Sequence, residues 1–410
     1  MERRPPLAPL ETAGQLAPVG PAPAASAPLD GWAPRAARLG VYLHVPFCAK
    51  RCGYCAFNTA PYLETAVPRF LRAIEAEIAL AGAAPWARGV RAASVFFGGG
   101  TPSLLAPAEL AGILDALRAR FPLEAGAEVT VECNPESVSR DRLAGYRAAG
   151  VNRISLGVQS LEDRVLPTLD RLHTAADARR AFDDARAAGF DNVSVDLIYG
   201  LPGTDGAGWE RTVAGVLAWA PDHLSAYALS LDEGSVWSAA GVGGLPGEDE
   251  AAAQYQTLTR LARAAGYEHY EISNYARPGR RSAHNQLYWR AEEYLAFGPG
   301  ACGFLGVVRY GNEKPLDRYC GTLEAGRLPV ATHETLTARQ RLAERLFLGL
   351  RTADGVPEAW LDERVNLEPE RLAACVQRWR ERGLLETRDG RARLTEDGFL
   401  LSDALFVDLL

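Results

Sequence analysis

Short apolar runs alternate with longer amphipathic stretches over the first two-thirds of the chain. The runs have the length and β-branched character of strands, and the stretches between them repeat apolar positions with a helical period. The expected strands are Val41–Val45, Ala93–Phe97, Glu128–Glu132, Arg153–Leu156, Val193–Ile198 and Leu224–Leu229. The expected helices are Ala66–Ala81, Pro107–Arg120, Ser139–Ala149, Ala175–Ala188 and Gly208–Ala218.

Local end signals support this division into strands and helices. Ser139 stands where an N-cap is wanted, and Gly150 and Gly189 follow helix ends where a left-handed residue is favoured. Repeated βα units build a parallel sheet, so we expect an α/β fold with a partial, open (β/α)6 barrel over residues 39–314. Such sheets carry their chemistry at the carboxyl ends of the strands.

The pattern changes after a break near residues 315–336. Thr337 and Gln340 form a capping-box sequence before the apolar positions Leu342, Leu346 and Leu350. A helix around residues 371–382 and a hairpin with its turn at Asp389–Gly390 follow. We therefore expect a winged-helix-like α+β module over residues 315–410. Winged helices also bind DNA, but no cluster of basic and base-reading residues stands out here.

The first 38 residues are rich in Pro and Ala and show no periodicity. Such a segment cannot bury enough apolar surface to offset its ordering entropy, so we expect a disordered tail. A transit peptide is the competing interpretation because Arg3 and Arg4 are present. Glu2, Glu11 and Asp30 weigh against it, since transit peptides are poor in acidic residues.

Composition narrows the class of protein. Apolar residues make up 48% of the chain and charged residues 23%, as in ordinary globular proteins. No apolar run reaches the ~20 residues of a transmembrane helix. The net charge of −7 argues against a dedicated nucleic-acid binder. Seven thinly spread cysteines fit a reducing compartment, and we expect a cytoplasmic location.

Three cysteines, Cys48, Cys52 and Cys55, follow the first expected strand with C-x3-C-x2-C spacing. Thiolates are the soft ligands that iron–sulfur clusters require. Three thiolates on a four-iron cubane leave one iron open to a small molecule that carries an amine and a carboxylate. The spacing resembles that of radical S-adenosylmethionine (SAM) enzymes.

Two other interpretations of these cysteines stay open. A zinc site would need a fourth ligand, for which His44 is a candidate. A disulfide with a spare thiol is the second. The remaining cysteines are expected to be small buried apolar residues; they are Cys133, Cys302, Cys320 and Cys375.

Other notable residues fall at the ends of later strands. Three glycines follow the second strand in Phe97-Gly-Gly-Gly-Thr-Pro102, where the backbone can pass close to a ligand. Glu132 and Asp196 end the third and fifth strands, and Gln159 follows the fourth. A half-buried carboxylate is costly without a partner, and a cationic sulfonium ligand would supply one.

These motifs together resemble the oxygen-independent coproporphyrinogen III oxidase family of radical SAM proteins. The resemblance extends from about residue 39 to the C-terminus. The motifs that carry it are Tyr42-Leu-His-Val-Pro-Phe-Cys48, Phe97-Gly-Gly-Gly-Thr-Pro102, Val131-Glu-Cys-Asn-Pro135, Ser155-Leu-Gly-Val-Gln-Ser160 and Asp196-Leu-Ile-Tyr-Gly-Leu-Pro202. The true oxidase carries a further cysteine where this chain has Phe57, so the chain looks like the heme-chaperone (HemW-like) branch.

His284-Asn-Gln-Leu-Tyr-Trp289 matches the H-N-x-x-Y-W signature associated with heme in that branch. A histidine can ligate heme iron, and the aromatic residues can pack against a flat macrocycle. From the residues alone, a hydrogen-bonded His284 with aromatic neighbours in the core is the favoured interpretation, and only the resemblance reverses this preference.

The resemblance implies that Cys48, Cys52 and Cys55 bind a [4Fe-4S] cluster and that His284 serves heme. Two departures from the usual pattern are Ala56 in place of Asp and Asp170 in place of a Gly before Arg171. The residues implied to surround SAM are Tyr42, Tyr54, Gly99, Gly100, Thr101, Glu132, Gln159, Arg171 and Asp196.

The function implied is a heme chaperone that passes heme to acceptor hemoproteins. An electron donor such as a flavodoxin or ferredoxin would reduce the cluster, which then passes one electron to SAM. The alternative within the family is a true oxidase that decarboxylates coproporphyrinogen III to protoporphyrinogen IX. A structural zinc protein of unrelated function is the third possibility.

Overall fold

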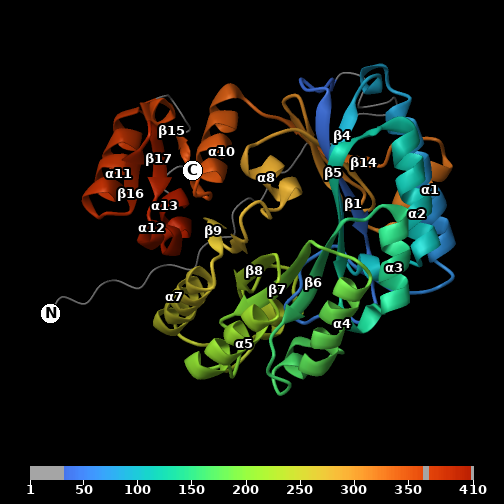
Figure 1. The fold of residues 1–410 in the computed structure, drawn as a ribbon. Helices are drawn as coiled ribbons and strands as arrows, with labels where there is room; N and C mark the ends of the chain where they lie inside the picture. The colour runs from blue at the N-terminus through green and yellow to red at the C-terminus, as the bar shows by residue number, and fades with distance from the viewer. Residues whose placement is uncertain (1–31, 363–368, 408–410) are drawn as a thin grey trace.

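A computed structural model describes residues 32–362 and 369–407 of the chain (Figure 1). The predicted disorder of the leading tail falls largely on residues 1–31, which lie outside the described residues. One large sheet of 12 strands runs through the molecule, in the order β14-β13-β12-β11-β1-β4-β5-β6-β7-β8-β10-β9. Within the described residues, no helix combines the length and apolar character needed to cross a bilayer.

The centre of the sheet is the predicted series of parallel strands. The six strands are β1 (Arg38–Val45), β4 (Arg91–Gly99), β5 (Leu123–Cys133), β6 (Arg153–Gln159), β7 (Val193–Tyr199) and β8 (His223–Ala228). Each strand pairs in parallel with the next. The helices between them are α1 (Val67–Gly82), α2 (Pro107–Arg120), α3 (Arg140–Ala149), α4 (Ala175–Ala187) and α5 (Gly206–Ala218). The predicted α/β fold with a partial (β/α)6 barrel is confirmed.

Burial explains why these units form. Helix α1 buries Phe70, Ile74 and Ile78 at helical spacing, so one stripe of the helix packs on the sheet. In β1, neighbouring residues on both faces are buried, as expected of a parallel strand covered on its two sides. The Ser139 side chain accepts a hydrogen bond from Arg142 N, and Gly150 ends α3 with φ of 104°. Helices α1 to α5 follow one another along the sheet (Figure 1).

Antiparallel strands extend both edges of the sheet and were not predicted. On one side β11 (Tyr294–Phe297) pairs in parallel with β1, and three antiparallel strands follow. These are β12 (Cys302–Leu305), β13 (Val308–Asn312) and β14 (Val330–Thr335). On the other side lie β10 (Asn274–Ala276) and β9 (Glu268–Glu271). Since β14 belongs to this sheet, the change to a second sheet comes after Thr335, later in the chain than residue 315.

The ordered chain also begins earlier than residue 39. The ring of Trp32 stacks on that of Tyr310 with centroids 5.8 Å apart. The Glu293 carboxylate accepts hydrogen bonds from the backbone N–H groups of Arg35 (2.8 Å) and Ala36 (3.0 Å). Residues 32–38 are therefore held in place, and the predicted tail boundary at residue 38 is too late. The partners lie far away in sequence, so local composition gives no sign of them.

The C-terminal unit forms the winged-helix-like α+β module that the sequence predicts. Its three-stranded sheet has the order β15-β17-β16, and Leu346, Trp379 and Phe399 belong to a core of its own. The Thr337 capping box and the hairpin at Asp389–Gly390 are both present. Its elements are α10 (Ala338–Leu350), β15 (Val356–Pro357), η5 (Glu358–Asp362), α11 (Pro369–Glu381), β16 (Leu385–Arg388), β17 (Arg391–Leu394), α12 (Glu396–Leu400) and α13 (Ser402–Val407).

Smaller elements connect these parts. Helix α8 (Ala283–Trp289) lies between the large sheet and the C-terminal unit (Figure 1). Helix α9 (Leu316–Glu324) is on the sheet side of the boundary and ion-pairs to α1 through Arg69 and Glu324. The remaining described elements are β2 (Phe47–Cys48), β3 (Ala60–Pro61), η1 (Pro85–Ala87), η2 (Pro102–Leu104), η3 (Pro135–Ser137), η4 (Leu166–Leu169), α6 (Val236–Ala240) and α7 (Glu248–Ala264).

Candidate cofactor site

A cavity of about 420 Å³ opens at the carboxyl ends of the parallel strands. Most of the predicted site residues line this one cavity: Cys48, Cys52, Tyr54, Cys55, Gly99, Gly100, Thr101, Glu132, Gln159, Arg171 and Asp196. Tyr42 lines an adjoining cavity of about 640 Å³, which shares Gly99 and Glu132 with the first. His284 lines neither. The structure therefore brings together residues that are spread over five strands.

The cysteine loop is closed at its base by backbone hydrogen bonds. The short strands β2 and β3 pair in parallel, and Tyr62 N donates to Cys48 O over 2.9 Å. At the tip, Cys55 N donates to Cys52 O over 3.1 Å. The side chain of Asn58 donates to the carbonyl of Pro299, which follows β11, the neighbour of β1 in the sheet. These bonds fold the loop back over the end of β1, with all three thiols free and half-buried.

Burial and hydrogen-bond donors act in opposite directions on the thiols of the cysteine loop. The Thr101 hydroxyl lies 3.7 Å from Cys48 Sγ, and Arg171 Nη1 lies 3.9 Å from Cys52 Sγ. Burial raises the pKa of the Cys48 thiol to about 11, and the Thr101 hydrogen bond opposes this rise. Because a bare thiolate is disfavoured there, a bound metal cluster is the kind of partner that would stabilise it.

The alternative of a zinc site with His44 finds no support in the geometry. His44 Nδ1 bonds to the Tyr42 hydroxyl (3.0 Å) and its Nε2 to the carbonyl of Asn58 (2.8 Å). Across residues 32–362 and 369–407, no three His, Cys, Asp or Glu side chains stand close enough to share one metal ion. In a cubane each cysteine binds a different iron, so the sulfurs stand farther apart than the ligands of a single zinc ion. The donor set therefore fits a cluster better than zinc.

The glycine turn after β4 allows two backbones to meet. A Cβ on Gly100 would lie 2.6 Å from the carbonyl oxygen of Phe47 and 2.8 Å from that of Pro46. Both contacts are with main-chain atoms, which cannot move aside as a flexible side chain can. Gly99 has φ of 113°, and a Cβ there would meet the ring of His44 at 2.5 Å. Gly100 N donates to Val45 O and Thr101 N to Phe47 O. Because these residues carry no side chain, the turn brings the main chain of Gly99 and Gly100 to the cavity wall.

Two buried carboxylates face the same cavity. Burial raises the pKa of Glu132 to about 8, and the charge of Asp196 adds to the rise, while Gly99 N–H opposes it. Burial also raises the pKa of Asp196, although the Ser155 hydroxyl donates to it over 2.9 Å. The charge of Arg153 lowers both pKa values but does not outweigh burial, so a cationic ligand is favoured beside these two acidic groups.

Arg171 and Gln159 complete the wall. Arg171 Nη2 donates to the carbonyl of Gly157 (2.5 Å) and to Asn134 Oδ1 (2.9 Å), whereas its buried Nε has no hydrogen-bond partner among the described residues. Gln159 adopts φ of 65°, and the pairing of β6 with β7 shifts register between Gly157 and Gln159. This bulge turns Gln159 toward the cavity.

The unusual Asp170 before Arg171 keeps a backbone conformation that normally favours glycine. Its φ is 58°, and Asp is one of the few side chains that tolerate this region. Its carboxylate ion-pairs with Lys50 over 2.7 Å.

Two features of the cavity region were missed from sequence or predicted wrongly. Asn134, within a motif noted above, contacts Arg171, and Cys302 is exposed where burial was predicted because it begins the short strand β12 beside the adjoining cavity.

His284 packs against Ser94 and Phe96 of β4 and does not line the cofactor cavity. Its Nδ1 bonds to Ser94 Oγ and its Nε2 to the Tyr288 hydroxyl, both at 2.8 Å. The ring is buried and stacks on Phe96 with centroids 5.1 Å apart. Burial lowers the pKa of His284 to about 3, so the ring is neutral. In this conformation both ring nitrogens are engaged, and ligation of an iron would require one of them to be released. Its role as a heme ligand stays a prediction.

Comparisons with known proteins agree with this geometry. The model of the radical SAM superfamily matches residues 42–214, and that of the HemN C-terminal domain matches residues 336–401. The structure described as coproporphyrinogen III oxidase (HemN) from Escherichia coli superposes with a TM-score of 0.79 at 24% identity, covering 91% of this chain and 90% of that one. The fold and the cysteine-lined cavity thus define a radical SAM protein.

Sequence relatives narrow the class further. The heme chaperone HemW of Mycobacterium tuberculosis is 41% identical over 93% of this chain and 97% of its own length. HemW of Bacillus subtilis is 33% identical over 89% of this chain and 97% of its own. A mitochondrial radical S-adenosyl methionine domain-containing protein 1 from Bos taurus is 38% identical over 92% of this chain and 88% of its own. The chain belongs to the HemW family of radical SAM proteins.

Proposed function

We propose that this protein is a heme chaperone that binds a [4Fe-4S] cluster, SAM and heme and passes heme to acceptor hemoproteins. The observation that carries the cofactor part is the convergence of three free cysteines with a glycine turn and two buried carboxylates in one cavity. The relatives named heme chaperone support the remainder. A soluble electron carrier such as a flavodoxin or ferredoxin is the proposed source of electrons.

Each wall of the cavity has a proposed part in holding the cofactors. Cys48, Cys52 and Cys55 would hold the cluster, and the main-chain carbonyl groups of the glycine turn at Gly99 and Gly100 would accept hydrogen bonds from the SAM ammonium group. A cluster with bound SAM supplies one-electron cleavage of a carbon–sulfur bond. The proposed SAM site also includes Tyr42, Tyr54, Thr101, Glu132, Gln159, Arg171 and Asp196.

One observation favours a chaperone over a true oxidase. Phe57, at the position where the oxidase branch carries a further cysteine, has no thiol, and its side chain is 67% exposed beside the cavity. The phenyl ring of Phe57 has no thiol and no acidic proton, so it cannot take over the chemistry of that cysteine. The oxidase therefore remains the second candidate, supported by the shared fold alone.

A single anaerobic preparation tests both candidates. After reconstitution with iron and sulfide, we expect a brown protein that binds SAM and about one heme per chain. Cys55→Ser should lose the cluster while the chain stays folded, which provides the matched control. The same preparation, given SAM, a reductant and coproporphyrinogen III, should form no protoporphyrinogen IX. Efficient conversion would overturn the chaperone assignment, and absence of a SAM-responsive cluster would overturn the cofactor assignment.

A further inference from the structure

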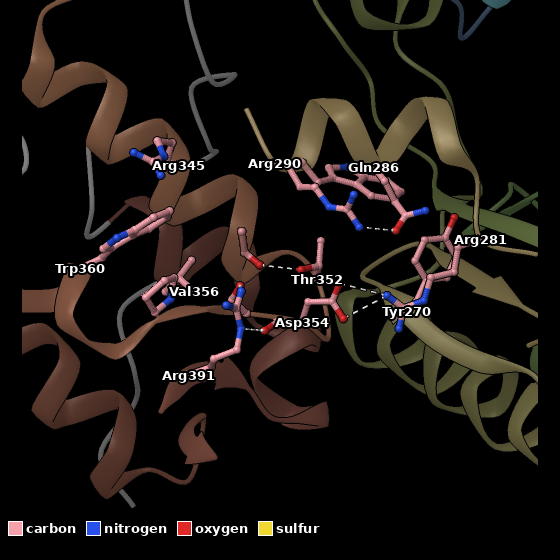
Figure 2. A pocket seen from close by; sticks show the side chains of 14 residues that line it. Tyr270, Arg281, Gln286, Arg290, Arg345, Thr352, Asp354, Val356, Trp360 and Arg391 are labelled. Carbon is pink, nitrogen blue, oxygen red and sulfur yellow. Dashed lines mark hydrogen bonds and ion pairs between the residues drawn. The ribbon is translucent and has the colours of Figure 1, made fainter. Parts of the chain in front are cut away.

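A separate cavity of about 330 Å³ lies between α8 and the C-terminal unit (Figure 2). One wall comes from α8 and the residues just before it, and the other from α10, η5 and residues 352–357. It shares no lining residue with the cysteine-lined cavity. The volume lies at the lower end of the range for small-molecule sites, roughly 300–1,000 Å³.

Helix α8 presents different residues on its two faces. His284 and Leu287 are buried toward the large sheet. Gln286, Trp289 and Arg290 line the cavity, and their spacing of three and four residues places them on one face of the helix turn.

The sheet fixes the orientation of this helix. The Glu128 carboxylate of β5 accepts hydrogen bonds from the N–H groups of Ala283 and His284, each at 3.0 Å. His284 adds the bond to Ser94 of β4. The inner face of α8 therefore positions the outer face before any ligand arrives, which reduces the ordering entropy of binding.

The cavity carries an excess of positive charge. Four arginines line it against one carboxylate, Asp354. Arg281 pairs with that carboxylate over 3.0 Å, and Arg391 donates to the carbonyls of Asp354 and Gly355, each over 2.6 Å. These two arginines are occupied in holding the wall.

The other two arginines are available to a ligand. Arg290 donates to Gln286 over 2.9 Å, and Arg345 lies over the ring of Trp360, 3.9 Å from its centroid. Among the described residues, neither has a carboxylate partner. They come from opposite walls, Arg290 from α8 and Arg345 from α10 (Figure 2). Guanidinium groups pair well with carboxylates, often through two parallel hydrogen bonds.

Flat aromatic surfaces accompany these charges. Trp360 stands on the C-terminal wall, and Trp289 on the α8 wall packs edge-to-face on Tyr270 with centroids 5.6 Å apart. Half-buried indole rings offer apolar contact to a planar ring system. The combination of two free guanidinium groups with two indole surfaces selects a flat ligand that carries carboxylates at its edge.

We propose that this cavity binds the carboxylate-bearing edge of a tetrapyrrole, with Arg290 and Arg345 pairing with two carboxylates and Trp289 and Trp360 contacting the macrocycle. The proposal rests on the heme-binding function proposed above. Because the cavity is smaller than a whole tetrapyrrole, the rest of the ring stays accessible to an acceptor. The protein recognises the carboxylates and the macrocycle of the ligand, so binding at this cavity does not require the iron atom.

The test compares two ligands on the full-length, anaerobically reconstituted protein. Hemin and metal-free protoporphyrin IX are titrated separately into the wild type, Arg290→Gln/Arg345→Gln and the control Arg140→Gln/Arg260→Gln, which removes two exposed arginines elsewhere. We expect the first double variant to weaken both ligands by about tenfold or more, since two charge-assisted contacts are lost. The control variant should bind like the wild type, and equal urea unfolding midpoints verify that all three are folded.

The outcomes separate this inference from the proposed function. If the wild type binds hemin and the Arg290/Arg345 variant binds it equally well, the site assignment is wrong while heme binding stands. If hemin binds but the metal-free porphyrin does not, recognition depends on iron and the assignment is also wrong. A wild-type chain that binds neither ligand overturns the proposed function itself.

Discussion

The carboxylate of Asp170 accepts a hydrogen bond from the backbone N–H of Gly53, 3.1 Å away at the tip of the cysteine loop. The residue before Arg171 thus reaches across the cavity to the loop between the second and third cysteines. Together with the ion pair to Lys50, this contact ties the loop to the segment after β6. Because Asp170 stands at φ of 58°, the contact is made at a strained backbone position.

We predict that Asp170→Gly has opposite effects on backbone strain and on the anchoring of the cysteine loop, which two different measurements report. Glycine relaxes the left-handed conformation by about 1 kcal/mol, whereas loss of the carboxylate frees the cysteine loop. Global stability should therefore change little, while the cluster should bleach several-fold faster in air. The absorbance decay of the reconstituted protein measures this. Asp170→Asn, which keeps an acceptor for Gly53, should fall between the two, and equal decay in all three proteins would contradict the anchoring role.

Gly100→Ala should destabilise the protein or prevent the loop from closing, because the added Cβ meets main-chain atoms of Pro46 and Phe47 below 3 Å. Backbone shifts of this kind cost on the order of 1–3 kcal/mol. Gly206→Ala is the matched control, since nothing lies within 4 Å of a Cβ at that position. Urea unfolding of both variants measures the difference, and equal midpoints would show that the turn can yield.

Binding of SAM should release a proton from Glu132. Its pKa of about 8 in the free protein means that the carboxyl is mostly neutral at pH 7. A bound cation favours the ionised form, so affinity should rise with pH up to about 8 and then level off. Calorimetric titrations in buffers of different ionisation enthalpy count the protons at pH 7 and pH 9. Glu132→Gln should remove this contribution, and identical proton release in wild type and variant would exclude it.

Stability should fall as the pH drops below 6.5, the ordinary pKa of histidine. Burial lowers the pKa of four histidines, to about 4 for His269 and about 3 for His284. The other two are His44 and His223. The unfolded chain binds these protons first, so the folded state is favoured above pH 6.5 and loses that advantage as the pH approaches 4. His269 alone corresponds to about 3 kcal/mol. Urea unfolding at pH 7.5, 6 and 5 measures the slope, and a flat profile would contradict it.

His284→Ala tests the neighbourhood of α8. The variant loses hydrogen bonds to Ser94 and Tyr288 and leaves a buried space, so we expect a loss of stability of roughly 2–4 kcal/mol. Heme binding should weaken whether His284 ligates iron or positions α8. The absorption spectrum of bound hemin distinguishes these roles, because loss of an axial ligand changes the ligation state of the iron and with it the spectrum. An unchanged spectrum with weaker binding would identify His284 as a positioning residue.

The sequence revealed the parallel strands and the cofactor residues because both leave local signals. A buried parallel strand such as β4 contains an apolar run from Ala92 to Phe97 that is broken only by Ser94, and the three cysteines of the loop are recognised by their spacing. Strand β14 was missed because it is half-buried at the sheet edge, so its residues show no apolar run. One hydrogen-bond partner of His284 is Ser94, 190 residues away in the sequence. The cavity between α8 and the C-terminal unit joins segments from Tyr270 to Arg391, and no local pattern could predict it.

Helix α8 separates two cavities. Tyr288 faces the chamber that also holds Tyr42 and Glu132, while the very next residue, Trp289, faces the chamber on the opposite side. The backbones of adjacent residues in one short helix move together, so a tilt of α8 would change the shape of both cavities.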